Sequence, residues 1–197
     1  MKYFPLFTAA AIACASHSNV QAAGDWLIGG SVIWIENDID DTVGGLVRVG
    51  YNFQSDNQYG FNTDLELEIG YFELPDVFTS GDLVFGGDQE IVPILGNVRV
   101  HIPLAGAVGA YVGGGIGYAV VTTDFENAAF GRVKDTNIQY TYTFFAGVSI
   151  TLSDNAKLIG GYRYQSIDGD DLKKGDRPVF TSNQDYNIFE VGANILF

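Results

Sequence analysis

Several segments of the chain carry ionisable side chains at alternate positions between apolar residues. The clearest run is NTDLELEIGY, in which Asp64, Glu66 and Glu68 alternate with leucine and isoleucine. In VRVHI, Arg99 and His101 alternate with valine and isoleucine in the same way. A period of two residues puts these charges on one face of each β-strand. Charges that are shielded from water must pair, so the chemistry that this pattern predicts is a network of ion pairs.

The same parity argument places eight ionisable residues on the polar faces of the predicted strands: Arg48, Asp64, Glu66, Glu68, Arg99, His101, Arg163 and Glu190. Counting along the strands, we expect Arg48 to pair with Asp64 or Glu66, and Arg163 to pair directly with Glu190. One interpretation is a charged plug that holds the structure in shape. The other is the lining of a gated pore.

Two acidic clusters and His101 could support other chemistry. Oxygen-rich segments such as 36–41 and 168–171 can hold calcium, and the turn at Gly169 makes the second the better candidate. Neither matches a full EF-hand loop, so we interpret both as solvated faces. No serine or cysteine is placed to form a catalytic pair with His101. We therefore expect no enzyme activity, no metal site and no cofactor.

The elements that must position these charges are eight alternating segments separated by turn-rich polar stretches. Each has about the ten-residue length of a tilted membrane strand, or slightly more. The last, NIFEVGANILF, has apolar residues at Phe189, Val191, Ala193, Ile195 and Phe197, and polar or small residues at Glu190, Gly192 and Asn194. The predicted strands are 25–36, 43–53, 59–72, 90–102, 108–121, 139–152, 157–166 and 186–197.

These strands predict an all-β fold, an eight-stranded antiparallel transmembrane β-barrel with an up-and-down meander. The apolar faces would contact lipid and the charged faces would line a lumen just wide enough for side chains to fill. Glycines that face inward on the fifth strand would leave room for long side chains from across the lumen. The alternative is a soluble lipocalin-like barrel with the apolar face inward. It fits less well, because strands five and six would then give the outer surface no charge.

The N-terminus predicts a secretory signal peptide over 1–22, followed by the barrel domain over 23–197. Lys2 precedes an apolar run that is too short to span a bilayer, and Val20-Gln21-Ala22 has small residues suited to cleavage. The rival interpretation is a lipoprotein box in which Cys14, the only cysteine, is lipidated instead of removed. The formal net charge of −14 argues against a nucleic-acid partner.

The predicted connections alternate in length, as they do in outer-membrane barrels. Segments 54–57, 103–106 and 153–155 are short, whereas 73–89, 122–138 and 166–185 are long, and 37–42 is intermediate. Aromatic residues mark both rims, and we expect them to form girdles at the membrane interfaces. The predicted girdle residues are Trp26, Trp34, Tyr51, Phe53, Tyr71 and Tyr164.

The segment Tyr111–Ala119, YVGGGIGYA, resembles the glycine-rich fifth strand of small OmpA-type and opacity-type outer-membrane proteins. Residues 144–150 and 160–164 are similar to their sixth and seventh strands. The terminal Phe197 matches the residue that the outer-membrane assembly machinery is understood to read in such proteins. OmpA itself carries a periplasmic peptidoglycan-binding domain after the barrel. Because no residue follows Phe197 here, we do not expect anchoring to the cell wall.

The resemblance implies an outer-membrane barrel of a Gram-negative-type bacterium, and implies its function only weakly, because fold does not fix function. We expect a structural and surface-displaying role in which long loops meet lipids, hosts or other cells. A narrow, low-conductance pore is the alternative. The partners implied are outer-membrane lipids and lipopolysaccharide, the barrel-assembly machinery at the C-terminal strand, and ligands at the loops.

Overall fold

The computed structural model describes residues 24–36, 41–54, 60–74, 79–80, 83–84, 87–127, 131–168, 172–174, 177–180 and 184–197. The predicted signal peptide over 1–22 and the lipoprotein alternative at Cys14 lie outside these residues and stay predictions. Most of the two acidic segments considered for calcium, 37–40 and 169–171, also lies outside them.

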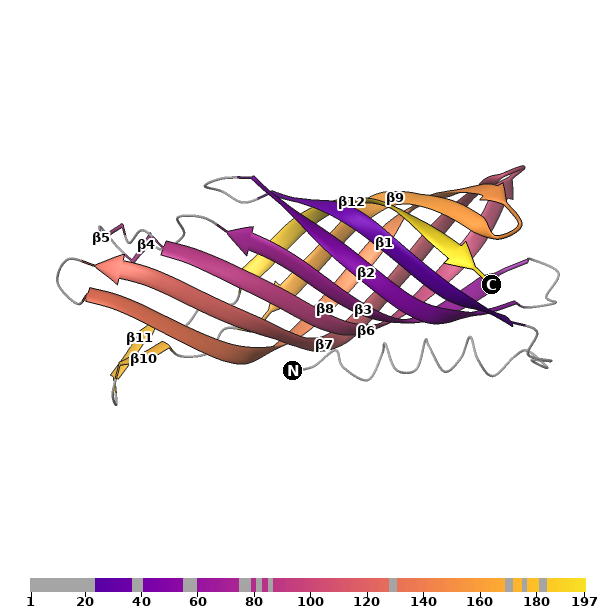
Figure 1. Ribbon diagram of the computed structural model, residues 1–197. Helices are drawn as coiled ribbons and strands as arrows, with labels where there is room; N and C mark the ends of the chain where they lie inside the picture. The colour runs from indigo at the N-terminus through magenta and orange to yellow at the C-terminus, as the bar shows by residue number, and fades with distance from the viewer. Residues whose placement is uncertain are drawn as a thin grey trace, which may run out of the picture.

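Eight strands close into one antiparallel barrel with the order β1-β12-β9-β8-β7-β6-β3-β2 (Figure 1). Strands that follow one another in the barrel are neighbours in the sheet, which confirms the predicted up-and-down meander. Two short hairpins, β4-β5 and β10-β11, interrupt the meander at the long-connection end. The barrel strands are β1 Gly24–Glu36, β2 Thr42–Phe53, β3 Asn62–Leu74, β6 Gly87–Ala105, β7 Val108–Asn127, β8 Gly131–Ser153, β9 Ala156–Ile167 and β12 Gln184–Leu196. The hairpin strands are β4 Thr79–Ser80, β5 Leu83–Val84, β10 Leu172–Lys174 and β11 Arg177–Phe180.

The alternation of side chains along each strand follows the predicted phase. In β3 the pattern of buried and exposed residues is almost strictly alternating, with Asp64, Glu66 and Glu68 buried and Leu65 and Leu67 exposed. An apolar side chain that faces outward has no protein core to enter, so lipid is the environment that this face fits. The soluble, inside-out alternative is therefore wrong. In the part of the chain that the structure describes, no helix is long and apolar enough to span a membrane.

The barrel closes between its first and last strands. β1 and β12 are paired from Leu27 opposite Leu196 to Glu36 opposite Asn187. The backbone amide of Phe197 donates to the Trp26 carbonyl at 3.0 Å, and the Trp26 amide donates back to the Phe197 carbonyl at the same distance. Both strand ends therefore lie at the rim that carries the short turns, which in such barrels is the periplasmic rim.

One predicted connection is wrong. Residues 122–138 were expected to be a long loop, but most of them continue the ladder between β7 and β8, up to Asn127 opposite Gly131. The strands extend in this way because residues beyond the lipid no longer need an apolar outer face. Polar β-formers such as Thr122 and Thr136 can hold the pairing in water. This ribbon reaches further from the barrel than β3 and β12 do (Figure 1).

Candidate functional site: the barrel lumen

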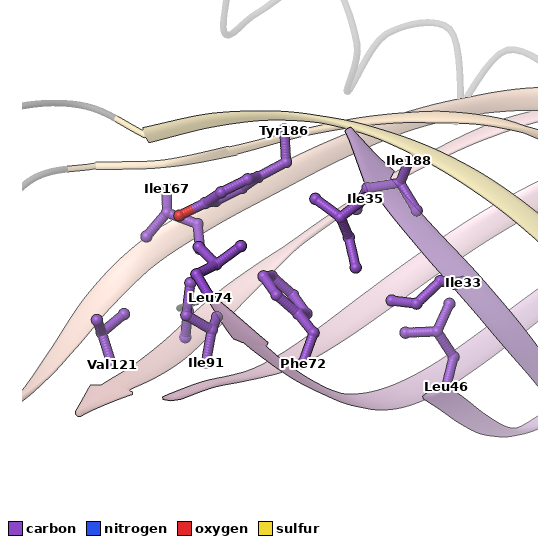
Figure 2. Packing of buried hydrophobic residues seen from close by; sticks show 11 residues of the cluster. Ile33, Ile35, Leu46, Phe72, Leu74, Ile91, Val121, Ile167, Tyr186 and Ile188 are labelled. Carbon is purple, nitrogen blue, oxygen red and sulfur yellow. The ribbon is translucent and has the colours of Figure 1, made fainter. Parts of the chain in front are cut away.

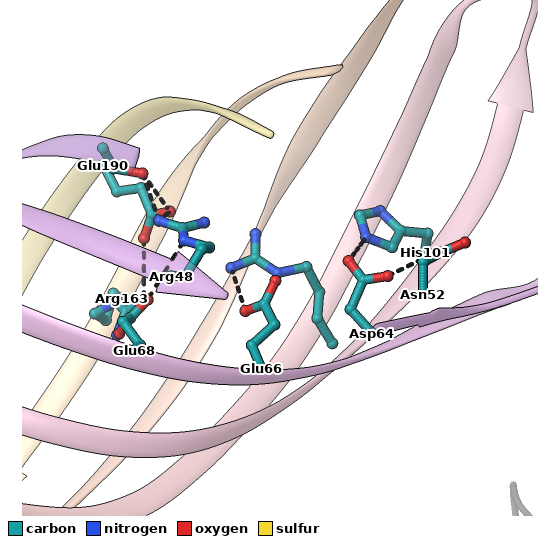
Figure 3. Close-up of polar contacts among 10 residues, drawn as sticks. Arg48, Asn52, Asp64, Glu66, Glu68, His101, Arg163 and Glu190 are labelled. Atoms are coloured by element: carbon teal, nitrogen blue, oxygen red, sulfur yellow. Dashed lines mark hydrogen bonds and ion pairs between the residues drawn. The ribbon is translucent and has the colours of Figure 1, made fainter. Parts of the chain in front are cut away.

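All eight ionisable residues predicted for the polar faces lie inside the lumen and are buried. They enter from five strands: Arg48 from β2, three carboxylates from β3, Arg99 and His101 from β6, Arg163 from β9 and Glu190 from β12. Figure 3 shows Glu190, Arg163 and Glu68 at one end of the row of charges, and His101 and Asp64 at the other end.

Four of these residues form a closed ring of alternating charge. Arg163 holds Glu68 with two hydrogen bonds, Nη1 to Oε1 at 2.6 Å and Nη2 to Oε2 at 2.9 Å. Its Nη2 also donates to Glu190 Oε2 at 3.1 Å. Arg48 Nη2 donates to Glu190 Oε1 at 2.9 Å, and Arg48 Nε lies 3.7 Å from Glu68 Oε2. Ser31 supports the ring, since its hydroxyl contacts both Arg48 and Glu190.

The ring joins opposite walls of the barrel. Glu68 on β3 and Arg163 on β9 lie on opposite walls, because three strands separate β3 from β9 in either direction around the barrel. The predicted contact between Arg163 and Glu190 is present. The stronger, bidentate partner is Glu68 across the lumen, which the comparison of neighbouring strands did not identify. Bidentate arginine–carboxylate pairs fix geometry as well as charge.

The predicted pairing of Arg48 with Asp64 or Glu66 is wrong. Glu66 is held by Arg99, whose Nη2 lies 3.2 Å from Glu66 Oε2. Asp64 is held by His101, with Nε2 and Oδ2 2.7 Å apart, and also accepts a hydrogen bond from Asn52. For Arg48 the register explains the difference, because Arg48 lies opposite Glu68 on β3. Glu66 and Asp64 instead bond to diagonal neighbours on β6, Arg99 and His101.

Two aromatic rings complete the arginine layer. The guanidinium of Arg99 lies over the rings of Tyr111 and Phe145, at 4.6 and 4.8 Å from their centroids, and Arg163 lies 5.1 Å from the Phe145 centroid. Such stacking stabilises a cation that is removed from water. Sequence reasoning did not single out these rings, although both occupy inward positions. Their parity was the signal that could have identified them.

Glycines make room for these rings. A Cβ atom on Gly147 or Gly161 would lie 2.6 or 2.5 Å from the Tyr111 hydroxyl. A Cβ atom on Gly113 of the predicted fifth strand would collide with Phe145 of the neighbouring strand. The inward glycines therefore do create space, as expected. The side chains next to Gly113 and Gly115 of the fifth strand are Phe145 and Asn97, which come from adjacent strands and not from across the lumen as expected.

On the long-connection side of the ring the lumen is apolar. Figure 2 shows Phe72, Leu74, Tyr186 and several isoleucines pointing toward one another between the strands. The cluster consists of Ile33, Ile35, Leu46, Phe72, Leu74, Ile91, Ala119, Val121, Ile167, Tyr186 and Ile188, all 5% exposed or less. The rings of Phe72 and Tyr186 meet edge to face, with centroids 5.5 Å apart. This layer was not predicted from the sequence.

The predicted girdle residues all lie on the outer face. Trp26 is 57% exposed, Trp34 and Tyr71 are exposed, and Tyr51, Phe53 and Tyr164 are half-buried. At the periplasmic rim the rings of Trp26, Tyr51 and Phe53 pack in a row, with centroids 5.7 and 4.9 Å apart. Further along the barrel, Tyr142 and Tyr164 are 6.4 Å apart.

The geometry supplies an occluded lumen in which arginines and carboxylates are paired, and among the described residues no arrangement for catalysis is evident in it. The side chain that contacts the ring nitrogen of His101 is the carboxylate of Asp64, at 2.7 Å. Within the described residues, no three histidine, cysteine, aspartate or glutamate side chains are grouped in a way that could hold a metal ion. The expectation that the protein is not an enzyme stays a prediction.

Comparisons with known proteins agree with this architecture. A major outer membrane protein from Thermus thermophilus superposes with a TM-score of 0.60 at 14% identity, covering 89% of this chain and 100% of that one. Neisserial surface protein A superposes with a TM-score of 0.51 at 11% identity, covering 88% and 97%. The attachment invasion locus protein Ail of Yersinia pestis, in complex with the heparin analogue sucrose octasulfate, gives 0.50 at 15% identity, also covering 88% and 97%.

These identities show a shared fold and no more. A search of curated protein sequences gives no match. The family model of the outer membrane protein beta-barrel domain matches residues 6–197, nearly the whole chain. Together with the closed eight-stranded barrel and its apolar outer face, this match means that the chain belongs to the outer membrane protein β-barrel domain family and resides in the outer membrane of a Gram-negative-type bacterium.

Proposed function

We propose that the protein is a structural barrel, closed to solutes, that holds its long extracellular connections at the cell surface. The observation that carries this proposal is the ring of Arg48, Glu68, Arg163 and Glu190, which ties opposite walls together across the lumen. A channel for solutes needs a continuous path for water. Here Phe72 and Ile91, two members of the apolar cluster in the lumen, are fully buried.

The surface-displaying part of the proposal rests on the β7–β8 ribbon. The last residue of β9 lies opposite Thr141 on β8, and beyond that point the ladder between β7 and β8 continues to Asn127 opposite Gly131. A paired ribbon presents its side chains at fixed positions, and that lowers the entropy cost of binding a partner. Cell-surface or host ligands at this ribbon are part of the proposal, as are lipopolysaccharide around the barrel and the assembly machinery at Phe197.

The charge of the chain narrows the class of ligand. Ail binds a sulfated heparin analogue in its crystal structure. This chain has 24 acidic residues against 10 lysines and arginines. Exposed carboxylates such as Glu73, Glu90 and Asp185 lie at the long-connection end. A polyanion would be repelled by this surface, so we propose a neutral or cationic partner instead.

A planar-bilayer recording tests closure. The refolded protein should give no stable conductance steps, whereas the alternative, a narrow pore, predicts small and persistent steps. A wide conductance would refute the structural proposal. Surface display is tested by an epitope inserted between Asn127 and Gly131, which antibody should reach on intact cells. The matched control is the same epitope at the Gly106 turn, which should react only after the outer membrane is permeabilised.

A further inference from the structure

The inward-facing residues change character at one level of the barrel. Along β3 they run Asp64, Glu66, Glu68, and then, beyond a glycine, Phe72 and Leu74. Along β12, read from its C-terminal end, Glu190 is followed by two apolar residues, Ile188 and Tyr186. On β1, Ser31 is followed by isoleucines in the same way. The lumen therefore has a charged half toward the periplasmic rim and an apolar half toward the long connections.

The apolar half closes the lumen almost completely around its circumference. Residues of the cluster come from β1, β2, β3, β6, β7, β9 and β12, which leaves β8 as the one barrel strand without a member. On β8 the buried Thr141 faces the same level and is bonded to the Ser166 carbonyl. Several strands supply two members each, so the layer is roughly 5 Å deep between residue centres in a tilted barrel.

The charged half has a different property. Twelve buried side-chain nitrogen and oxygen atoms of the described residues make no hydrogen bond within the protein. All but Gln139 Oε1 belong to residues of the charged half: Arg48, Glu66, Asn97, Arg99, His101, Arg163 and Asn194. Buried polar atoms that lack a protein partner are normally satisfied by water. In the apolar cluster, by contrast, there is little for water to bind.

We propose that the charged half of the lumen is a hydrated vestibule reached from the periplasmic side, and that the apolar layer is the barrier to water and ions. This inference rests on the proposed closed barrel and says where the closure lies. Ions cross a hydrophobic constriction poorly because the water in it is unstable and their hydration shell is lost.

The ring of charges is the weaker barrier of the two. Arg48 and Arg163 each contact the same two carboxylates, Glu68 and Glu190. Either arginine can therefore rotate away while the carboxylates keep a partner, and incoming water can replace the lost bonds. Water cannot replace the contact between the packed rings of Phe72 and Tyr186 in this way, because that contact is apolar.

Conductance of matched variants tests the inference in the full chain. Phe72→Ser should raise the open probability in a planar bilayer on the order of tenfold or more, because it makes the layer polar and smaller. The ring variant, Glu68→Gln with Glu190→Gln, keeps the shape of both side chains and should stay closed. Val121→Thr, which nearly preserves volume, serves as a second layer variant if Phe72→Ser does not fold. The heat-modifiable gel band reports folding in each case.

The outcomes separate the inference from the proposed function. Wide conductance in the unchanged protein would refute the closed barrel itself. A closed unchanged protein, with an open ring variant and silent layer variants, would overturn the inference and leave the closed barrel standing. Silence of every folded layer variant would also overturn it.

Thiol labelling tests the hydrated vestibule separately. Residues 23–197 contain no cysteine, so in a Cys14→Ala chain any labelling comes from the single cysteine that is introduced. Asn97→Cys lies in the charged half, and Thr123→Cys lies beyond the apolar layer. In oriented proteoliposomes, a small methanethiosulfonate reagent should label Asn97→Cys from the periplasmic side only. Thr123→Cys should react from the opposite side only. Failure of Asn97→Cys to react from the periplasmic side, or labelling of either cysteine from both sides, would contradict the proposal.

Discussion

Replacing Arg163 with leucine should destabilise the barrel more than any other single change in the charge ring. The change removes three hydrogen bonds, of 2.6, 2.9 and 3.1 Å, and leaves Glu68 with only the 3.7 Å contact to Arg48. Removing one partner of a buried ion pair costs about 3–5 kcal/mol, because the other charge stays buried and uncompensated. We expect a loss in this range for Arg163→Leu.

Glu190→Gln should cost less. It keeps the shape of the side chain, and both arginines retain Glu68. Losing the charged acceptor of three hydrogen bonds, from Arg48, Arg163 and Ser31, should cost about 1–3 kcal/mol. The loss of unfolding free energy in the double variant should be about 1–3 kcal/mol smaller than the sum of the two single losses, because each single variant already removes the contact between Arg163 and Glu190. Glu36→Gln, on an exposed strand end, is the matched control and should change stability by at most about 0.5 kcal/mol.

The assay is equilibrium unfolding in lipid vesicles, followed by gel mobility and by tryptophan fluorescence. The chain has two tryptophans, and Trp26 and Trp34 both face outward from β1. Their emission therefore reports loss of the lipid environment without being changed directly by a variant in the lumen. Additive losses in the double-mutant cycle would refute the pairing of Arg163 with Glu190. A loss for Arg163→Leu as small as that of Glu36→Gln would refute the whole ring.

Three further predictions use other features. Gly161→Ala should destabilise the barrel by about 1–3 kcal/mol in the same unfolding assay, because the new Cβ would collide with the Tyr111 hydroxyl. Gly160→Ala is the control and should change stability little, because its Cβ would meet no atom closer than 3.8 Å. Glu90→Gln should stabilise by about 0.2–1 kcal/mol in that assay, because Glu90 lies directly opposite another glutamate on β3. Deleting Phe197 should slow or prevent assembly, measured by the fraction of heat-modifiable protein; Phe197→Ala should also slow it if the ring is the recognition feature, and unchanged assembly of both would remove that role.

The strands and the lumen residues could be predicted because a strand has a fixed period of two. Once Leu65 and Leu67 are taken to face lipid, Glu66 must face the lumen, whatever the exact strand ends. The family resemblance implied the same architecture. The ends of β7 and β8 could not be found in this way. Apolar alternation reports contact with lipid, and it stops at the membrane surface even where backbone pairing continues to Asn127.

The pairings inside the lumen depended on information that parity does not contain. Ile188 lies directly opposite Arg163, so the predicted partner Glu190 is a diagonal neighbour, and Glu68 reaches Arg163 from the opposite wall. Which side chains share a level depends on the tilt of the strands and the shear of the closed barrel. Neither can be counted from one rim along separate strands.

The apolar layer was missed for a related reason, and it changes how the charges are understood. Ile33 and Ile35 alternate with Trp34, so this segment is apolar on both faces. The sequence pattern therefore does not show which face points into the lumen. Charged residues are easy to recognise in a sequence. From the sequence alone, one would therefore conclude that only these charges determine whether the barrel conducts ions. In this structure the same strands that contribute Glu68 and Glu190 contribute Phe72 and Tyr186 one level further along. The ring can thus hold the barrel walls together while a chemically different layer excludes water. The two roles can be separated by substitution, because a variant of one layer leaves the other intact.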